Sequence, residues 1–206
     1  MNSSTNHRIV SFIKTVLLKV LNTRWVKIHY LILDINPYEL ARRMEEFNLT
    51  VKELAYEDFF KGDSLYFNEK KMLFYKNRFR DCTYKAYGIM IDGILVYSSW
   101  ISTHRLGMGF SLKNKDFYLC SNEGYLEDDY CHPNFRGNGF HTQMIAYRIN
   151  ELYKIGKTRI VVTVADGNTP ALKALLKNNF QDVGTFYVGK ILGRRFVTLN
   201  KKKYEQ

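Results

Sequence analysis

Residues 131–141, which read CHPNFRGNGFH, combine a proline, an arginine and two glycines in one short run. Gly137 and Gly139 carry no side chains, so several backbone N–H groups can point at one anion. A helix-like segment follows at Phe140, and the start of a helix carries partial positive charge. Arg136 adds a charge-assisted donor. The run therefore predicts either a plain turn or a cradle for an anion such as a pyrophosphate.

Three acidic residues, Glu127, Asp128 and Asp129, precede this run. In a regular strand, Glu127 and Asp129 would share one face and Asp128 would lie on the other. Crowded carboxylates raise one another's pKa, which suits a general base. The alternative interpretation is an acidic strand edge that binds a cation or pairs with basic residues.

The elements that must position these residues follow from hydrophobic periodicity and turn signals. RIVVTVA at 159–165 is nearly continuous apolar sequence, which predicts a strand buried on both faces and parallel to its neighbour. A strand at 124–131, a helix at 140–155 and this strand then form a right-handed βαβ crossover. The other predicted elements are a strand at 25–33, helices at 37–47 and 68–80, a hairpin at 84–101 turning at Asp92-Gly93, a short helix capped by Asn168 or Thr169, and a closing hairpin at 183–200.

Two segments together resemble the GNAT superfamily of N-acetyltransferases. HPNFRGNGF, preceded by YLEDDYC, is similar to the acetyl-CoA signature of a strand, then R/Q-x-x-G-x-G/A, then a long helix. VTVADGNTPALKALLKNNF resembles the second conserved block of a strand, an Asn and a short helix. The resemblance covers roughly residues 24–200. It implies an α/β fold with a mixed, mostly antiparallel central sheet, a parallel βαβ splay that binds CoA, and flanking helices.

The resemblance also implies a set of ligand contacts for acetyl-CoA as cosubstrate. The strand at Tyr130 and Cys131 would pair with the pantetheine arm, and a backbone N–H near Cys131 would polarise the thioester carbonyl. Asn168 matches the family Asn that reaches the pantetheine. The pyrophosphate would be held by backbone N–H groups of Arg136, Gly137, Asn138, Gly139, Phe140 and His141.

For catalysis, the resemblance makes Glu127 the first candidate for the general base, with Asp129 beside it in the catalytic group and Asp128 as an acceptor-binding candidate. The chain departs from the family at two positions. Asn134 stands at the first R/Q position, and Leu175 stands where many members carry a Tyr as general acid. We expect the thiolate to leave unaided or to take a proton from a substitute such as Tyr187 or Tyr130.

Two further residues of the run have chemical potential. His132 is placed to act as a base, although a histidine there is more often a solvated loop residue. Cys131 suggests a covalent acyl-cysteine, but the family transfers directly and a small apolar residue is usual at that position.

Composition limits the alternatives. The chain has 206 residues, which suits one domain, and a net charge of +11, which favours anionic partners. The three cysteines form no CxxC pair and the five histidines no metal-ligand spacing, so we expect no metal site and a reducing, cytoplasmic location.

The N-terminus adds a separate feature. Residues 9–21 show helical apolar spacing broken by Lys14 and Lys19, too short and charged to span a bilayer. We therefore predict an amphipathic helical extension at 1–23 before an acetyltransferase domain at 24–206. The extension either packs on the domain or makes weak contact with a membrane surface.

The leading hypothesis is an N-acetyltransferase that moves an acetyl group from acetyl-CoA to a primary amine of an amino sugar, polyamine or amino acid. The positive charge favours an anionic acceptor and YLED favours a cation, so the acceptor stays open. The first alternative is a catalytically impaired acyl-CoA-binding or regulatory protein. The second, a basic module on nucleic acid or membrane, rests on charge and the N-terminal helix alone, and we expect no nucleic-acid partner. A homodimer is compatible with these observations.

Overall fold

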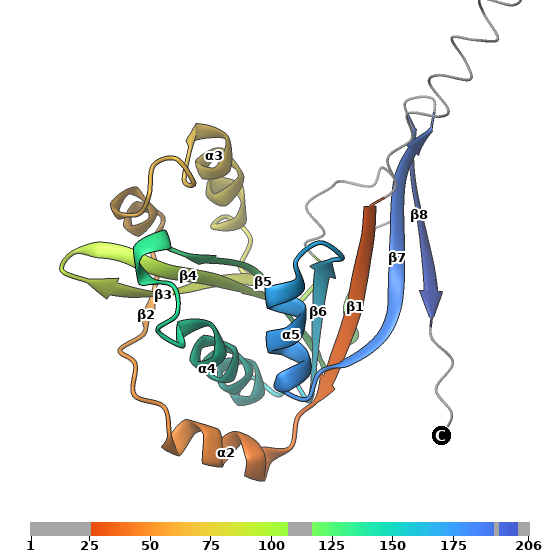
Figure 1. Ribbon diagram of the computed structural model, residues 1–206, viewed down its shortest axis with the longest axis horizontal. Coiled ribbons are helices and arrows are strands. Elements are labelled where there is room, and N and C mark those ends of the chain that lie inside the picture. Colours follow the sequence, from red (N-terminus) through yellow and green to blue (C-terminus); the bar gives the residue numbers. More distant parts are fainter. Residues whose placement is uncertain (1–25, 107–116, 192–193, 202–206) are drawn as a thin grey trace, which may run out of the picture.

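The computed structural model describes residues 26–106, 117–191 and 194–201 (Figure 1). The predicted helical extension at 1–23 lies outside the described residues. Within them, one eight-stranded sheet has the order β2-β3-β4-β5-β6-β1-β7-β8. Its strands are β1 Val26–Asp34, β2 Lys52–Glu53, β3 Tyr84–Ile91, β4 Ile94–Ser102, β5 Glu123–Cys131, β6 Arg159–Ala165, β7 Gln181–Ile191 and β8 Arg194–Lys201.

Most neighbouring strands are antiparallel, and β5 with β6 forms the parallel pair. The predicted mixed, mostly antiparallel sheet with one parallel βαβ unit is therefore confirmed. The hairpin at 84–101 is confirmed as well, because β3 and β4 pair antiparallel across Asp92 and Gly93. Both turn residues have positive φ, 50° and 79°, as a tight two-residue hairpin requires.

Helices cover both faces of the sheet (Figure 1). On one face lie α2 Pro37–Glu45, α4 Phe140–Lys154 and α5 Thr169–Lys177, and on the other lies α3 Glu69–Arg78, next to the 3-10 helix η1 Tyr56–Lys61. Side-chain oxygens of Asn36, Asn68 and Asn168 cap the first turns of α2, α3 and α5. The four helices confirm the helical segments predicted for this part of the chain.

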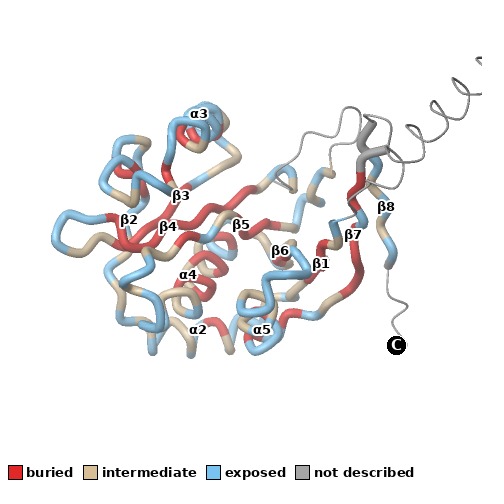
Figure 2. The backbone as a smooth tube through the Cα atoms, turned by 45° about the horizontal axis from the view of Figure 1, so that its top comes forward, coloured by how far each residue is buried: buried red, intermediate tan, exposed pale blue. Residues whose placement is uncertain are grey.

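Two of the three apolar clusters among the described residues lie beneath these helices. One fills the space between α4 and the sheet and includes Leu126, Ile145 and Val162. The other, under α3 and η1, is mostly aromatic and is built around Phe59, Tyr75 and Trp100. Figure 2 shows the resulting pattern, with buried backbone along the central strands and exposed backbone at the helix ends and turns.

Strand β1 lies between β6 and β7 and pairs antiparallel with both, although it comes first in the chain. His29 of β1 links β1 to the segments on both sides of it. Its Nε2 lies 2.9 Å from Asp166 Oδ1, just after β6, and its Nδ1 lies 2.9 Å from Asp182 Oδ2 on β7. One imidazole therefore joins three neighbouring segments of the sheet.

Candidate functional site

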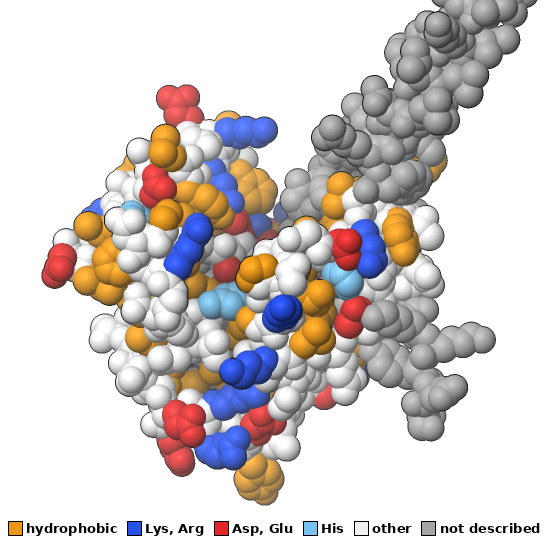
Figure 3. All heavy atoms as spheres, in the orientation of Figure 1, with side chains coloured by type: hydrophobic (Ala, Val, Ile, Leu, Met, Phe, Trp, Pro, Cys, Tyr) orange, Lys and Arg blue, Asp and Glu red, His pale blue; other side chains and the backbone are white. Residues whose placement is uncertain are grey.

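The sheet opens between its two parallel strands. β5 and β6 pair from Glu123 with Arg159 to Leu126 with Val162, and β5 then continues to Cys131 along β4 alone. A cavity of about 240 Å³ lies in the opening, and its lining includes Leu126, Glu127, Asp129, His141, Arg148 and Leu175. Figure 3 shows a hollow in this face of the molecule, between the surface over β4 and β5 and the surface over α5. The predicted splay of the two strands is thus present.

The 131–141 run lies between β5 and α4, as the sequence predicts. A short 3-10 helix, η2 Pro133–Phe135, leads into Gly137 and Gly139, whose φ angles are 86° and 73°. Apart from the glycine itself and its chain neighbours, no described atom comes within 4 Å of a Cβ built on either glycine. No side chain of the described residues caps the start of α4 at Gly139. The first N–H groups of a helix have no partner within it, so this open, uncapped turn suits an anion.

Side chains brace the run from within. Arg136 Nε donates to the carbonyl of Cys131 at 3.4 Å, and Asn138 Nδ2 donates to the carbonyl of Phe135 at 3.0 Å. His132 Nδ1 accepts from the N–H of Asn134 at 3.3 Å, which gives this histidine a role in shaping the loop.

The end of β5 offers a backbone donor to the opening. The N–H of His132 donates to Val96 of β4 at 2.8 Å. Successive N–H groups of a strand point to opposite edges, so the N–H of Cys131 points away from β4 and into the opening. Burial raises the pKa of the Cys131 thiol, which keeps it protonated and disfavours a nucleophilic role.

The acidic run does not follow the regular alternation of a strand. Between Ser98 and Trp100 of β4 the register with β5 shifts, so that Tyr130 pairs with Ser98 but Glu127 with Trp100. Asp128 sits in this β-bulge with φ of 55°. The prediction that Glu127 and Asp129 share one face is therefore wrong. The bulge places Glu127 and Asp128 together on the α3 side of the sheet, as their shared contact with Arg78 shows, and Asp129 on the α4 side.

Glu127 is the most deeply buried of the three acids, with 6% of its surface exposed. Its Oε2 accepts from Arg78 Nη2 at 2.6 Å, and its Oε1 is buried without a hydrogen-bond partner among the described residues. Burial raises the pKa of Glu127 to about 8, although the positive charge of Arg78 works in the opposite direction. A carboxylate with a raised pKa beside a cavity has the properties of a general base.

The other two acids are each paired with basic side chains. Asp128 accepts from Lys71 Nζ at 2.7 Å and from Arg78 Nη1 at 3.1 Å. Asp129 accepts from Arg148 Nη2 at 2.6 Å. The acidic run predicted as a catalytic or acceptor-binding group is therefore electrically balanced by cations of its own chain.

Asp129 also belongs to a chain of hydrogen bonds on the α4 side. Asp129 Oδ1 accepts from the hydroxyl of Tyr97 at 2.7 Å. The hydroxyl oxygen of Tyr97 in turn lies 2.9 Å from Nδ1 of His141. Burial lowers the pKa of His141, which favours the neutral ring near pH 7. Since Tyr97 donates to the carboxylate, its oxygen accepts from His141, and this fixes the ring with its proton on Nδ1.

Sequence reasoning missed Arg78 and Arg148, although each had a signal. Arg78 continues the buried stripe of Met72 and Tyr75 on α3. Arg148 stands four residues after Met144 on the apolar stripe of α4 and is fully buried, and its Nη1 donates to the carbonyl of Trp100 at the bulge. A basic residue on an apolar helix face indicates a buried partner.

Residues of the second predicted block border the same cavity. Asn168 Oδ1 accepts from the N–H of Ala171, so the predicted pantetheine contact also caps α5. Leu175, which replaces the family tyrosine, is 3% exposed and lines the cavity.

The two predicted substitutes for the general acid lie in different places. Tyr187 lies on β7 and pairs with Lys27 of β1. The strands β6 and β1 separate it from β5, so the structure does not bring Tyr187 to Glu127. Tyr130 is on β5, but its ring stacks on Tyr66 at 4.3 Å between centroids, in the aromatic core under α3.

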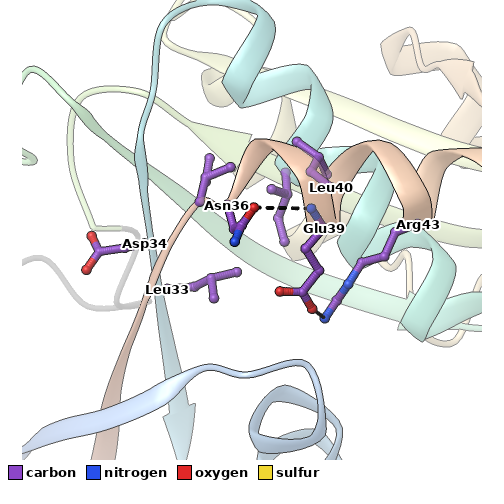
Figure 4. Close-up of a pocket in the computed structure, with 8 residues that line it drawn as sticks. Leu33, Asp34, Asn36, Glu39, Leu40 and Arg43 are labelled. Carbon is purple, nitrogen blue, oxygen red and sulfur yellow. Dashed lines mark hydrogen bonds and ion pairs between the residues drawn. The ribbon is translucent and has the colours of Figure 1, made fainter.

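A second, smaller pocket lies away from this opening. It holds about 30 Å³ where β1 leads into α2, and Leu33, Leu40 and Ile149 supply apolar lining. In Figure 4, Asn36 caps Glu39, whose carboxylate pairs with Arg43 at 2.6 Å. The acidic and amide side chains that line this pocket already have partners: Asp34 pairs with Arg159, Asn36 accepts from the N–H of Glu39, and Glu39 pairs with Arg43. The volume of the pocket is about that of a water molecule. We assign no ligand to it.

Two features are absent from the described part of the chain. No group of three or more His, Cys, Asp or Glu side chains there is arranged to hold a metal ion. No helix among the described residues is long and apolar enough to cross a membrane.

The sequence matches the model of the Acetyltransferase (GNAT) family over residues 51–180. The match spans more than half of the 206 residues and includes both the loop after β5 and the start of α5. The chain therefore belongs to the GNAT family of acetyltransferases. No curated protein matches the sequence.

Solved structures share the fold at low sequence identity. A functionally unknown conserved protein from Staphylococcus epidermidis ATCC 12228 is 8% identical, with a TM-score of 0.56 over 93% of this chain and 68% of that one. A Drosophila protein is 13% identical, with a TM-score of 0.55 over 94% and 59%. A glucosamine N-acetyltransferase region of a fungal multi-domain GH3 β-N-acetylglucosaminidase is 13% identical, with a TM-score of 0.55 over 95% and 23%. At these identities the likeness shows the fold alone.

Proposed function

We propose that this protein is an acetyl-CoA-dependent N-acetyltransferase that acts on a primary amine of a small molecule. One observation carries the proposal. The opening between β5 and β6 joins an uncapped, glycine-rich helix start to a cavity lined by a buried carboxylate with a raised pKa. In this proposal, donor binding and proton removal would take place side by side in one site.

The donor would bind along the opening. The backbone N–H groups from Arg136 to His141 suit its pyrophosphate, since two glycines hold the turn open and, in the part of the chain that the structure describes, no side chain caps α4. The pantetheine arm would take the edge of β5 that β6 vacates after Leu126. The N–H of Cys131, directed into this opening, would donate to the thioester carbonyl and stabilise negative charge on its oxygen.

Glu127 would act as the base. An alkylammonium must lose a proton before its nitrogen can attack, and Glu127 would take that proton directly or through a water molecule. The nitrogen then forms a bond to the acetyl carbon, the carbon–sulfur bond breaks, and the sulfur leaves as a thiolate. A thiol pKa of about 8.5 makes the thiolate a fair leaving group, so transfer does not depend on an acid at Leu175.

The cysteines bear on where the protein is located. Cys82, Cys120 and Cys131 are all free thiols, as in proteins of a reducing compartment, and we propose a cytoplasmic location. The homodimer and the membrane contact of residues 9–21 stay predictions.

A second candidate function is binding or sensing of an acyl-CoA without transfer. The observation that favours it is the buried leucine at 175, where a proton donor for the thiolate is usual in the family. Incubation of the protein with acetyl-CoA and a panel of primary amines separates the two, with release of CoA thiol as the signal. Amine-dependent release supports the enzyme, and acetyl-CoA binding without release on any amine supports the second function.

A further inference from the structure

Arg78, the last residue of α3, touches two of the three acids through separate nitrogens. Its Nη2 donates to Glu127 at 2.6 Å and its Nη1 to Asp128 at 3.1 Å. Arg78 and Glu127 are each 6% exposed, so the contact between them is nearly dry. The bulge at Asp128 makes this fork possible, because it turns two consecutive carboxylates to the same side of the sheet.

Aromatic rings surround the guanidinium of Arg78. Its central carbon lies 4.4 Å from the ring centroid of Phe74, 5.0 Å from that of Trp100 and 5.3 Å from that of Tyr84. Rings at these distances stabilise a cation and also fix its orientation. The guanidinium is therefore held in place independently of Glu127.

Other charged groups face the same carboxylate from the elements packed around it. Asp128 on β5 raises the pKa of Glu127, and Arg148 on α4 lowers it without contact. Lys71 on α3 contacts Asp128 instead, and Tyr125 on β5 bonds to Thr163. Among the described residues, Arg78 alone forms an ion pair with Glu127.

We propose that Arg78 is a positioning residue that orients Glu127 and holds it as a carboxylate within an apolar environment. This role rests on the proposed function, in which Glu127 is the base. Asp128 belongs to the same group of ion pairs. It pairs with Arg78, the cation that also contacts Glu127, and it pairs with Lys71 as well.

The test replaces Arg78 in the whole protein and follows the Glu127 carboxyl directly. Infrared or carbon NMR spectra of protein with isotope-labelled glutamate, compared with Glu127→Gln to assign the signal, give its titration midpoint. In Arg78→Ala we expect the midpoint to rise by about 1–3 pH units, because burial and Asp128 are then opposed only by the more distant charge of Arg148. The rate of acetyl transfer should fall at pH 7, and its rise with pH should move to higher pH by the same amount.

Methylguanidinium, added at millimolar concentration, should restore both midpoint and rate in Arg78→Ala. It can occupy the space left by the Arg78 side chain, between the aromatic rings and the two carboxylates. Arg78→Lys keeps the charge but loses the planar fork, so its midpoint should stay near that of the wild type while the rate falls through poorer orientation. Lys85→Ala, which removes an exposed lysine paired with Glu53, is the matched control and should change neither quantity.

Unfolding curves show which variants are folded, and Arg78→Lys carries the test if Arg78→Ala does not fold. A folded Arg78→Ala with an unchanged midpoint, or an Arg78→Lys with wild-type rate and pH profile, would overturn the role of Arg78. If the wild-type protein transfers no acetyl group to any amine, the proposed function itself fails.

Discussion

Leu126 of β5 and Val162 of β6 form the last pair between the two parallel strands, and Glu127 is the next residue of β5. The sheet therefore begins to open at the residue proposed as the base. Both members of the pair are buried in the core under α4, which fixes the point of separation. Beyond it, β5 keeps its pairing with β4 as far as Cys131, so its free edge faces the cavity.

Replacement of Glu127 by glutamine should separate proton removal from donor binding. We expect the rate of transfer to fall by about 10²–10⁴-fold, the usual contribution of a general base. Because the pKa of Glu127 is raised to about 8, the wild-type rate should increase as pH rises through that value and the carboxylate forms. The variant should lose this component of the profile, as rates from pH 6 to 10 would reveal.

The affinity of Glu127→Gln for acetyl-CoA should stay that of the wild type, because the loop from Arg136 to His141 is unchanged. Glu53→Gln, at an exposed carboxylate paired with Lys85, serves as the matched control. A Glu127→Gln enzyme with wild-type rates would assign the base to another group.

The acceptor should carry one amine and no second positive charge. The three carboxylates at 127–129 are paired with Arg78, Lys71 and Arg148, so no free acid remains among them for a second ammonium. We expect kcat/KM for glucosamine to exceed that for spermidine by about tenfold or more, the factor that one missing interaction of about 1.4 kcal/mol produces. Faster turnover of spermidine would show that a substrate cation displaces one of these pairs.

His29→Ala should destabilise the junction of β6, β1 and β7. The imidazole bonds to a carboxylate on each side and its side chain is 11% exposed, so we expect a loss of about 1.5–3 kcal/mol in the free energy of unfolding. Urea unfolding measures it. The control is Asp34→Ala, which removes an exposed pair with Arg159 between β1 and β6 and should cost less than about 1 kcal/mol. Equal losses in the two variants would show that His29 contributes no more than a surface ion pair.

Much of the fold could be predicted from local sequence. The turn at Asp92-Gly93 and the cap at Asn168 are short-range signals, and each lies where the pattern placed it. The place of β1 between β6 and β7 could not be predicted, because pairing partners more than a hundred residues apart leave no periodic trace in a single sequence.

The site was predictable in its residue types and less so in its geometry. The glycine run marked the helix start because positive φ is a property of glycine itself. The faces of Glu127 and Asp129 were wrongly predicted, since alternation assumes a regular strand and Asp128 lies in a bulge. Arg78 lies 49 residues before Glu127, so only tertiary packing brings the two together.

The central claim is that the glycine turn before α4 holds acetyl-CoA, and calorimetric titration of two matched variants tests it most directly. Gly139 and Gly156 flank the same helix with φ of 73° and 82°, and apart from chain neighbours no described atom lies within 4 Å of a Cβ built on either residue. Alanine at either position should therefore cost a similar roughly 1 kcal/mol of stability. We predict that the wild type and Gly156→Ala bind acetyl-CoA equally, whereas Gly139→Ala binds about tenfold or more weakly. Absence of binding to the wild type, or equal binding to all three proteins, would contradict the claim.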